Sequence, residues 1–221
     1  MTDEKAFGLV IFDCDGVLVD SEIISCGTIA RLLTEFGVPC DFPQALDRYL
    51  GRPAQAVIDG YQKAKGQPLP AEFMRKWRTQ LFDAFDESLE AIPGVRKAIE
   101  SLPVPICLAS SSDAERIERC LRKTGLWDIF EGRAFNTGMV VNGKPAPDIF
   151  LYAAGAMRVH PADCLVIEDS PSGIKAAKTA GMTAWGFTGG RHYTVPEQTE
   201  RLLAAGADRI LTGMDMLRVA A

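Results

Sequence analysis

The sequence predicts an α/β protein: a doubly wound parallel sheet with an all-helical segment inserted after the first strand. Short, continuous apolar runs recur along the chain, and such runs are typical of strands buried on both faces of a parallel sheet. Amphipathic helical patterns lie between the runs, and this alternation favours a doubly wound sheet. Residues 20–91 differ, because they carry helical patterns and few strand signals.

The first predicted strand and two later ones share one design, because polar residues directly follow each of them. The runs are residues 8–12 before Asp13, residues 105–109 before Ser110, and residues 164–167 before Glu168 and Asp169. Ligands bind at the carboxyl ends of the strands in open α/β sheets. We therefore expect these polar residues to converge on one site.

The inserted segment contains four helical patterns. The first is an amphipathic helix that ends at Gly37 and carries its apolar residues at Ile29, Leu32, Leu33 and Phe36. The other three cover residues 45–50, 54–65 and 71–85. We therefore expect a core domain made of residues 1–19 and 92–221, and an inserted helical domain made of residues 20–91.

Further helices and strands complete the predicted core. Helical patterns follow Gly94, Asp113 and Pro147, and Asp113 is a suitable N-cap. Residues 183–187 and 209–211 are predicted to form two more strands. These elements alternate as a doubly wound sheet requires.

Composition argues against two classes of partner. The net charge is −5 and the pI about 5.2, with no basic run, so we expect no nucleic-acid partner. No stretch approaches the ~20 apolar residues that span a bilayer, and the first residues lack the features of a signal peptide. The six cysteines form no CxxC pair and fit reduced thiols in the cytoplasm, the compartment we expect.

Asp13 and Asp15 are the first candidate functional residues. In an extended segment residues i and i+2 point the same way, so both carboxylates would share one side while Cys14 turns to the other. Two carboxylates this close repel unless a cation, a proton or solvent compensates. Gly16 then permits a tight turn and a close approach of the backbone to a ligand.

Four more residues complete a site for a phosphate and a divalent cation. Glu168 and Asp169 add carboxylate oxygens, which Mg²⁺ prefers. Lys144, in a proline-stiffened loop, supplies a counter-cation. Ser110 offers a hydroxyl ahead of a helix N-terminus, whose N–H groups suit a phosphate oxygen. The charges of Mg²⁺ and Lys144 balance those of Asp13 and the other two acids, so a phosphate dianion can approach.

This set of residues indicates a phosphoryl-transfer mechanism. Asp13 attacks phosphorus and forms an aspartyl-phosphate. Asp15 donates a proton to the leaving alkoxide and then deprotonates the water that hydrolyses the intermediate. Mg²⁺ and Lys144 hold the transferring group, and Ser110 binds one of its oxygens.

The order and context of these residues resemble the four motifs of the haloacid dehalogenase superfamily. The matching segments are residues 12–22, Ser110, residues 143–150 and residues 167–174. They are most similar to the β-phosphoglucomutase-like and sugar-phosphatase subgroup, and the resemblance covers nearly the whole chain. It implies a Rossmann-like core with a helical cap. It also implies Mg²⁺ bound by the Asp13 carboxylate, the Asp15 carbonyl oxygen and Asp169, with Glu168 contacting the ion or lying behind these ligands.

Departures from the family patterns narrow the expected reaction. Dehalogenases of the superfamily lack the second aspartate of the first motif, so Asp15 disfavours carbon–halogen cleavage. Mutase members carry a lysine shortly after the serine of the second motif, where this chain has Asp113. The arginine of their cap is replaced by Ala54, although Arg52 lies nearby. Both changes favour a phosphatase over a mutase.

Basic residues of the inserted helices are candidate substrate contacts. They are Arg52, Arg75, Lys76 and Arg78. Such residues could meet an acidic substrate, for example a phosphorylated sugar acid, although charges on helices are usually just solvated. Ser111 is a further candidate, beside Ser110. We expect a small phosphorylated metabolite as the substrate, and a monomer or weak homodimer.

Three other functions stay open. A phosphomutase would use the same aspartyl-phosphate but require a bisphosphate activator. A signalling receiver domain also has a phosphoacceptor aspartate, a hydroxyl residue and a lysine, but it is shorter and lacks both the insertion and an acid in the place of Asp15. A catalytically dead binding protein is the third, and the intact motifs argue against it.

Overall fold

The chain divides into two compact units. The structure is a computed structural model that describes residues 6–52 and 54–220. One unit contains the described residues up to Val19 and those from Ala91 onward, and the other is Asp20–Glu90. This division lies one residue from the expected boundary at residues 91 and 92. That the two units are separately folding domains stays a prediction.

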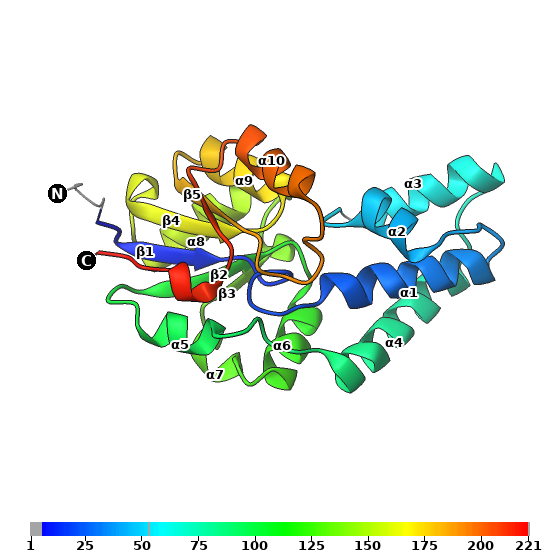
Figure 1. Ribbon diagram of the computed structural model, residues 1–221, viewed down its shortest axis with the longest axis horizontal. Coiled ribbons are helices and arrows are strands. Elements are labelled where there is room, and N and C mark those ends of the chain that lie inside the picture. The colour runs from blue at the N-terminus through cyan, green and yellow to red at the C-terminus, as the bar shows by residue number, and fades with distance from the viewer. Residues whose placement is uncertain (1–5, 53, 221) are drawn as a thin grey trace. The chain divides into compact units, whose positions relative to one another are not determined.

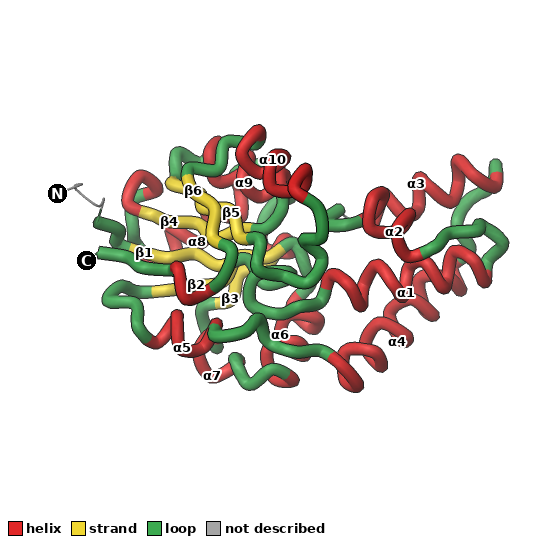
Figure 2. Tube along the Cα trace, viewed as in Figure 1, coloured by secondary structure: helices red, strands yellow, loops and turns green. Residues whose placement is uncertain are grey.

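The larger unit contains a six-stranded sheet, whose strands are drawn as arrows in Figure 1 and are labelled and drawn in yellow in Figure 2. The strands are β1 (Leu9–Phe12), β2 (Ile106–Ser110), β3 (Ala134–Asn136), β4 (Cys164–Glu168), β5 (Thr183–Phe187) and β6 (Arg209–Leu211). Their spatial order is β3-β2-β1-β4-β5-β6, and all neighbours are parallel. This order confirms the predicted doubly wound parallel sheet.

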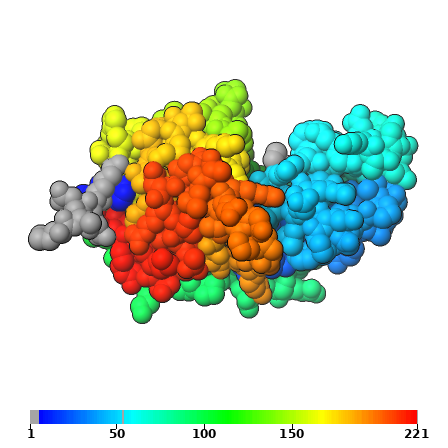
Figure 3. Space-filling model, turned by 45° about the horizontal axis from the view of Figure 1, so that its top comes forward, coloured from blue at the N-terminus to red at the C-terminus, as the bar shows by residue number. Residues whose placement is uncertain are grey.

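Helices cover both faces of the sheet. Successive residues of a strand point to opposite faces, so each strand contributes side chains to both helical layers. Leu9 and Ile11 share a buried cluster with Ile149 of α8. Phe12 faces the other side, where its ring packs edge-on against Phe130 of α7 with centroids 6.3 Å apart. In Figure 3 the orange segment around α10 forms part of the outer surface of this unit. Its helices are α5 (Val95–Glu100), α6 (Ala114–Lys123), α7 (Trp127–Phe130), α8 (Asp148–Met157), α9 (Pro171–Thr179) and α10 (Pro196–Ala204), with short 3₁₀ turns at Thr137–Met139, Pro161–Asp163 and Met214–Met216.

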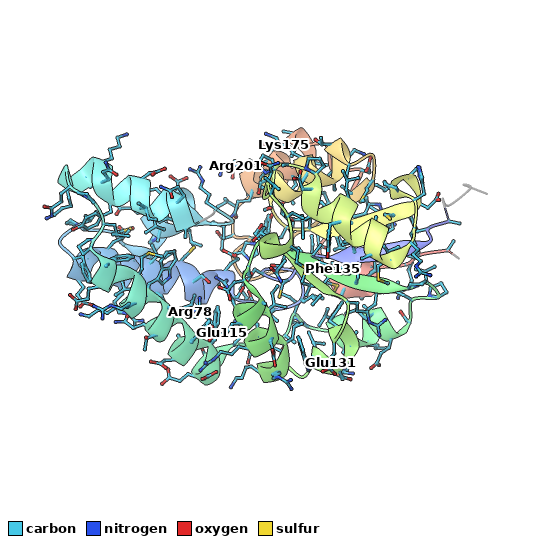
Figure 4. All side chains as sticks on the ribbon, turned by 180° about the vertical axis from the view of Figure 1, so that it is seen from behind. Arg78, Glu115, Glu131, Phe135, Lys175 and Arg201 are labelled. Carbon is cyan, nitrogen blue, oxygen red and sulfur yellow. The ribbon has the colours of Figure 1, made fainter. Side chains whose placement is uncertain are left out.

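Strand β3 is an element that the sequence pattern does not predict. It has three residues and no continuous apolar run, so it lacks the signal of a buried strand. Pairing with β2 places Phe135 opposite Ala109. The Phe135 ring, labelled in Figure 4, packs against Tyr152 of α8 with centroids 5.7 Å apart. Tertiary contacts rather than local sequence therefore define this edge strand.

The smaller unit is all-helical, as predicted. Its helices are α1 (Glu22–Glu35), α2 (Phe42–Tyr49), α3 (Ala54–Lys65) and α4 (Ala71–Ser88). Helix α2 begins earlier than expected, because Asp41 and Gln44 form a capping box. Phe73 of α4 is fully buried in the core of this unit, and its ring packs edge-on against Phe36 at 5.2 Å.

The described helices do not include a membrane-spanning one. Within residues 6–52 and 54–220, none combines the length and the apolar character that a bilayer crossing needs.

Candidate active site

The carboxyl ends of β1, β2 and β4 bring the predicted catalytic residues together. Phe12 at the end of β1 lies opposite Leu108 of β2 and Ile167 of β4. Asp13 therefore emerges beside the end of β4, and its backbone N–H donates to the Ile167 carbonyl at 3.0 Å. The strand order reverses at β1, and doubly wound sheets bind ligands at such a reversal.

Lys144 is buried at the centre of this cluster, with 3% of its side chain exposed. Its ammonium group donates to Asp13 Oδ1 at 2.6 Å, to Glu168 Oε1 at 2.8 Å and to the Ala109 carbonyl at 3.1 Å. An ammonium group has three hydrogens, so each of them has an acceptor. Lys144 thus joins the ends of β1, β2 and β4 through one cation.

Glu168 is oriented by contacts on both of its oxygens. Oε1 accepts from Lys144, and Oε2 accepts from the backbone N–H of Ser170 at 2.6 Å. A Cβ atom at Gly173 would lie 1.7 Å from Oε1, so only glycine leaves room for the carboxylate there. Glu168 therefore packs between Lys144 and the start of α9, and it is 1% exposed.

Ser110 and Ser111 lie in different environments. Ser110 is buried at the end of β2, and its Oγ accepts from the backbone N–H of Ser112 at 3.1 Å. Ser111 is exposed, and its carbonyl accepts from the Thr137 hydroxyl at 3.1 Å. The structure thus brings Ser110 to the same sheet edge as Asp13, whereas the side chain of Ser111 is at the surface.

Asp15 is held by two residues that the sequence analysis did not single out. Ser112 Oγ donates to Asp15 Oδ2 at 2.6 Å, and Arg116 Nη2 donates to Oδ1 at 2.6 Å. Arg116 stands on the first turn of α6 because Asp113 caps this helix, accepting from the Arg116 N–H at 3.0 Å. The sequence shows the run of serines and the basic residue after a helix cap. It does not show their contact with Asp15, which is about 100 residues away in sequence.

Asp169 lies against a glycine and a histidine. Gly16 has a positive φ of 77°, and a Cβ atom there would lie 1.9 Å from Asp169 Oδ2. The same oxygen is 3.1 Å from His192 Nε2 in the segment after β5. The sequence pattern alone assigns no role to that segment. Its only signal was the position of one of the chain's two histidines after a glycine pair at a strand end.

The charges at this site favour protonation of its acids. Burial raises the pKa of Asp13 well above its usual value, the Lys144 cation opposes this, and the nearby carboxylates reinforce it. Burial and the adjacent Glu168 likewise raise the pKa of Asp169. Burial disfavours the charge on Lys144 too, but Asp13 and Glu168 outweigh it, so the pKa of Lys144 is raised. The cluster thus has more negative charge than one lysine neutralises.

This excess of buried carboxylate oxygen fits a hard divalent cation such as Mg²⁺. Among the described residues, no three His, Cys, Asp or Glu side chains are grouped as a complete metal site. Mg²⁺ does not need one, because it commonly takes one or two carboxylates and fills its other positions with water and substrate phosphate. Asp13 and Asp169 meet that requirement.

The remaining substrate-binding candidates belong to the Asp20–Glu90 unit. Arg52 and Arg75 are exposed. Lys76 pairs with Glu35 at 2.6 Å and with Glu72 at 3.5 Å, so its charge is compensated within this unit. Their roles in binding substrate stay predictions.

Comparison with known proteins places the chain in a family. Residues 10–187 match the family described as haloacid dehalogenase-like hydrolase. A 6-phosphogluconate phosphatase of Escherichia coli is 29% identical over 83% of each chain, and a β-phosphoglucomutase of Bacillus subtilis is 31% identical over 82% of this chain and 84% of its own. A solved structure from Agrobacterium tumefaciens, a haloacid dehalogenase-like protein of unknown function, is 37% identical, covers 94% of each chain and has a TM-score of 0.84.

The matched range spans most of the chain and includes every strand end that carries a candidate catalytic residue. It begins within β1, ahead of Asp13, and ends at the last residue of β5. It therefore contains Lys144 and Asp169 as well as the inserted helices. The chain belongs to the haloacid dehalogenase-like hydrolase family.

Proposed function

We propose that this protein is a Mg²⁺-dependent phosphatase that hydrolyses a small phosphorylated metabolite through an aspartyl-phosphate on Asp13. The observation that carries the proposal is the buried cluster in which Lys144 bridges Asp13 and Glu168, at 2.6 and 2.8 Å, beside Asp169. Phosphoryl transfer requires an in-line nucleophile and stabilised equatorial oxygens rather than elaborate covalent chemistry. This cluster contains groups for both tasks.

The Asp13 and Asp169 carboxylates, with the Asp15 backbone carbonyl, would hold the metal ion. Mg²⁺, when bound, neutralises charge that develops on the transferring phosphoryl group. Glu168 has both oxygens engaged, by Lys144 and by the Ser170 N–H, and so supports the site from behind these ligands. This interpretation explains why two buried acids with raised pKa values stand beside a single lysine.

The reaction then follows from groups of the chain. An Asp13 carboxylate oxygen attacks phosphorus, and the bond from phosphorus to the leaving alkoxide oxygen breaks. The positive charge of Lys144 attracts the phosphoryl oxygens while its ammonium group restrains Asp13, and the Ser110 hydroxyl donates to one of these oxygens. Water then attacks the phosphorus of the aspartyl-phosphate, which releases inorganic phosphate and restores the Asp13 carboxylate.

Asp15 is the proposed general acid and base. The hydrogen bonds from Ser112 and Arg116, both 2.6 Å, favour its carboxylate form. That form is the one that removes a proton from the attacking water. Protonation of the leaving alkoxide requires the acid form, so we infer that the pair with Arg116 loosens when substrate binds.

A sugar phosphate or a phosphorylated sugar acid is the proposed substrate class. Support comes from the names of two relatives, a 6-phosphogluconate phosphatase and a β-phosphoglucomutase. Arg52 and Arg75 are exposed cations of the inserted unit that could meet an acidic substrate. The expected cytoplasmic location and the monomer or weak homodimer stay predictions.

A phosphomutase is the second candidate, and the similarity to a β-phosphoglucomutase favours it. Asp113 argues against it, because this residue caps α6 where mutases are expected to have a lysine. One assay separates the two: release of inorganic phosphate from sugar phosphates, against isomerisation that depends on a bisphosphate activator. Isomerisation without net phosphate release would replace the phosphatase proposal.

The decisive test combines a variant with metal removal. The wild-type protein is screened against phosphorylated sugars and sugar acids with Mg²⁺, and phosphate release is measured. Asp13→Asn should abolish turnover, because an amide does not act as the nucleophile, while circular dichroism shows an unchanged fold. EDTA should abolish wild-type turnover and added Mg²⁺ should restore it. Turnover by Asp13→Asn, or activity that survives full chelation, would contradict the mechanism.

A further inference from the structure

The segment after β5 carries a buried histidine at the active site. His192 is 1% exposed, and its Nε2 lies 3.1 Å from Asp169 Oδ2. In both the neutral Nε2–H tautomer and the imidazolium ion, the hydrogen on Nε2 is available to this oxygen. The contact joins the segment after β5 to the acid that directly follows β4. The mechanism above does not use it.

Two glycines form a slot for the imidazole ring. A Cβ atom at Gly190 would lie 2.6 Å from His192 Cε1 and 2.7 Å from Nδ1, and a Cβ atom at Gly16 would lie 3.0 Å from Cε1. A side chain at either position would displace the ring. The sequence therefore leaves space for His192 on two sides, one of them in the loop that follows Asp13.

Further hydrogen bonds fix this segment around Asp169. The Tyr193 hydroxyl donates to the Asp169 backbone carbonyl. Gln198, in the first turn of α10, donates from Nε2 to the His192 carbonyl at 3.0 Å and accepts from the Thr194 N–H at 2.8 Å. Asp169 is thus contacted on both its side chain and its main chain by consecutive residues that α10 anchors.

We propose that His192 is a positioning residue that fixes the Asp169 carboxylate for Mg²⁺ binding by donating a hydrogen bond to Oδ2. The proposal rests on the proposed function, because it takes Asp169 to be a ligand of the metal. A carboxylate rotates about its Cβ–Cγ bond, and a donor on one oxygen keeps the other oriented toward the cation. Partners that orient a ligand in this way commonly contribute about 10–100-fold to metal affinity.

The test measures Mg²⁺ affinity directly, by isothermal titration calorimetry on the complete protein without substrate. His192→Leu replaces the imidazole with an apolar side chain of similar size and so removes the donor, and it should weaken Mg²⁺ binding by about 10–100-fold. His192→Gln can place an amide N–H near the position of Nε2, and it should retain an affinity close to that of the wild type. Melting temperatures in EDTA compare the folding of the variants.

A second pair of variants tests the same contact without relying on His192→Leu. Gly190→Ala adds a methyl group where the imidazole lies, so it should weaken Mg²⁺ binding. In a His192→Ala background the ring is absent, and Gly190→Ala should then have little further effect. This non-additivity is expected only if Gly190 acts through the histidine.

The outcomes separate this inference from the proposed function. If the wild-type protein does not bind Mg²⁺, the proposed metal dependence fails. If it binds Mg²⁺ and His192→Leu binds equally well, the positioning role is wrong while the metal site stands. Equal weakening by His192→Leu and His192→Gln would also overturn the proposal, because it would assign His192 a packing role rather than a donor role.

Discussion

At the scale of single residues, the buried charge of Lys144 holds the acids of the site together. Its ammonium group contacts Asp13, Glu168 and the Ala109 carbonyl, and it is 3% exposed. Removing one partner from a buried ion pair leaves an uncompensated charge in a medium of low dielectric constant. A surface pair loses little, because water screens both charges. Whether a lysine is buried or exposed therefore decides how much its removal lowers the free energy of unfolding.

We expect Lys144→Met to lower the free energy of unfolding by about 3–5 kcal/mol at neutral pH in EDTA, because two buried carboxylates lose their cation. Lys178→Met is the matched control: Lys178 pairs with Asp208 at 2.7 Å, and both side chains are more than a third exposed. Its loss should cost about 0–1 kcal/mol. Denaturant unfolding measures both values, and equal losses would contradict the assigned role of burial.

Asp15 allows a prediction about catalysis at the same scale. Asp15→Asn should lower kcat by about 10²–10⁴-fold, the usual contribution of a general acid–base group. Arg116→Gln should lower kcat by a smaller factor, because Arg116 acts through Asp15. In the Asp15→Asn background Arg116→Gln should add nothing. Steady-state kinetics of the double-mutant cycle decide this, and an undiminished effect of Arg116→Gln without Asp15 would assign Arg116 a separate role.

Strand ends and helix starts organise the site at the scale of elements. The apolar runs of β1, β2 and β4 each end where a polar residue enters the cluster, which made these elements predictable. Strand β3 was missed because three residues carry no periodic signal and pairing with β2 alone makes them a strand. Helix α9 has Gly173 in its first turn, and glycine is needed there because Glu168 occupies the space beside it.

Two helical glycines should respond to alanine in opposite directions. Gly173→Ala in α9 places a methyl group 1.7 Å from Glu168 Oε1, so we expect a loss of about 1–3 kcal/mol and lower activity as Glu168 is displaced from Lys144. Gly155→Ala in α8 meets no atom within 4 Å. It should stabilise the protein by about 0.5–1 kcal/mol, because alanine loses less backbone entropy in a helix. Thermal unfolding compares the two, and a shared sign would contradict this account.

Burial of the cysteines is a property of the molecule as a whole. All six are free thiols and buried. Burial raises the pKa of Cys120 to about 12, so this thiol stays protonated in the folded protein at mildly alkaline pH. Thiolates, not thiols, are the nucleophiles toward alkylating reagents. The folded chain should therefore react far more slowly than the unfolded one.

We expect almost no thiol to react with a maleimide or disulfide reagent in the native protein, and all six to react in concentrated guanidinium chloride. Burial of Cys120 also makes the stability of the folded protein depend on pH. Its folded pKa of about 12 lies above the reference value of 9.0, so its stabilising contribution is complete below pH 9 and is lost as the pH rises toward 12. Rapid labelling of the native protein would contradict the burial.

The catalytic set itself was open to prediction because each member sits next to a strong local pattern. Asp13 and Asp169 follow buried strands, and Lys144 lies in a proline-rich loop that resembles a family motif. Arg116 and His192 had no comparable signal. Their partners are about 100 and 23 residues away, and only the folded chain brings them to Asp15 and Asp169.

The sequence by itself determined the class of fold and the chemistry of the central acids, because apolar periodicity and residues at strand ends are local properties. Only the tertiary structure decided how those acids are held. In the folded chain Glu168 contacts Lys144 and packs against the start of α9. Asp15 pairs with Arg116, and Asp169 contacts His192. The physical reason is that a buried carboxylate needs a hydrogen-bond donor or a cation beside it, and the packing of the chain decides which group lies there. That choice depends on distances between residues far apart in sequence.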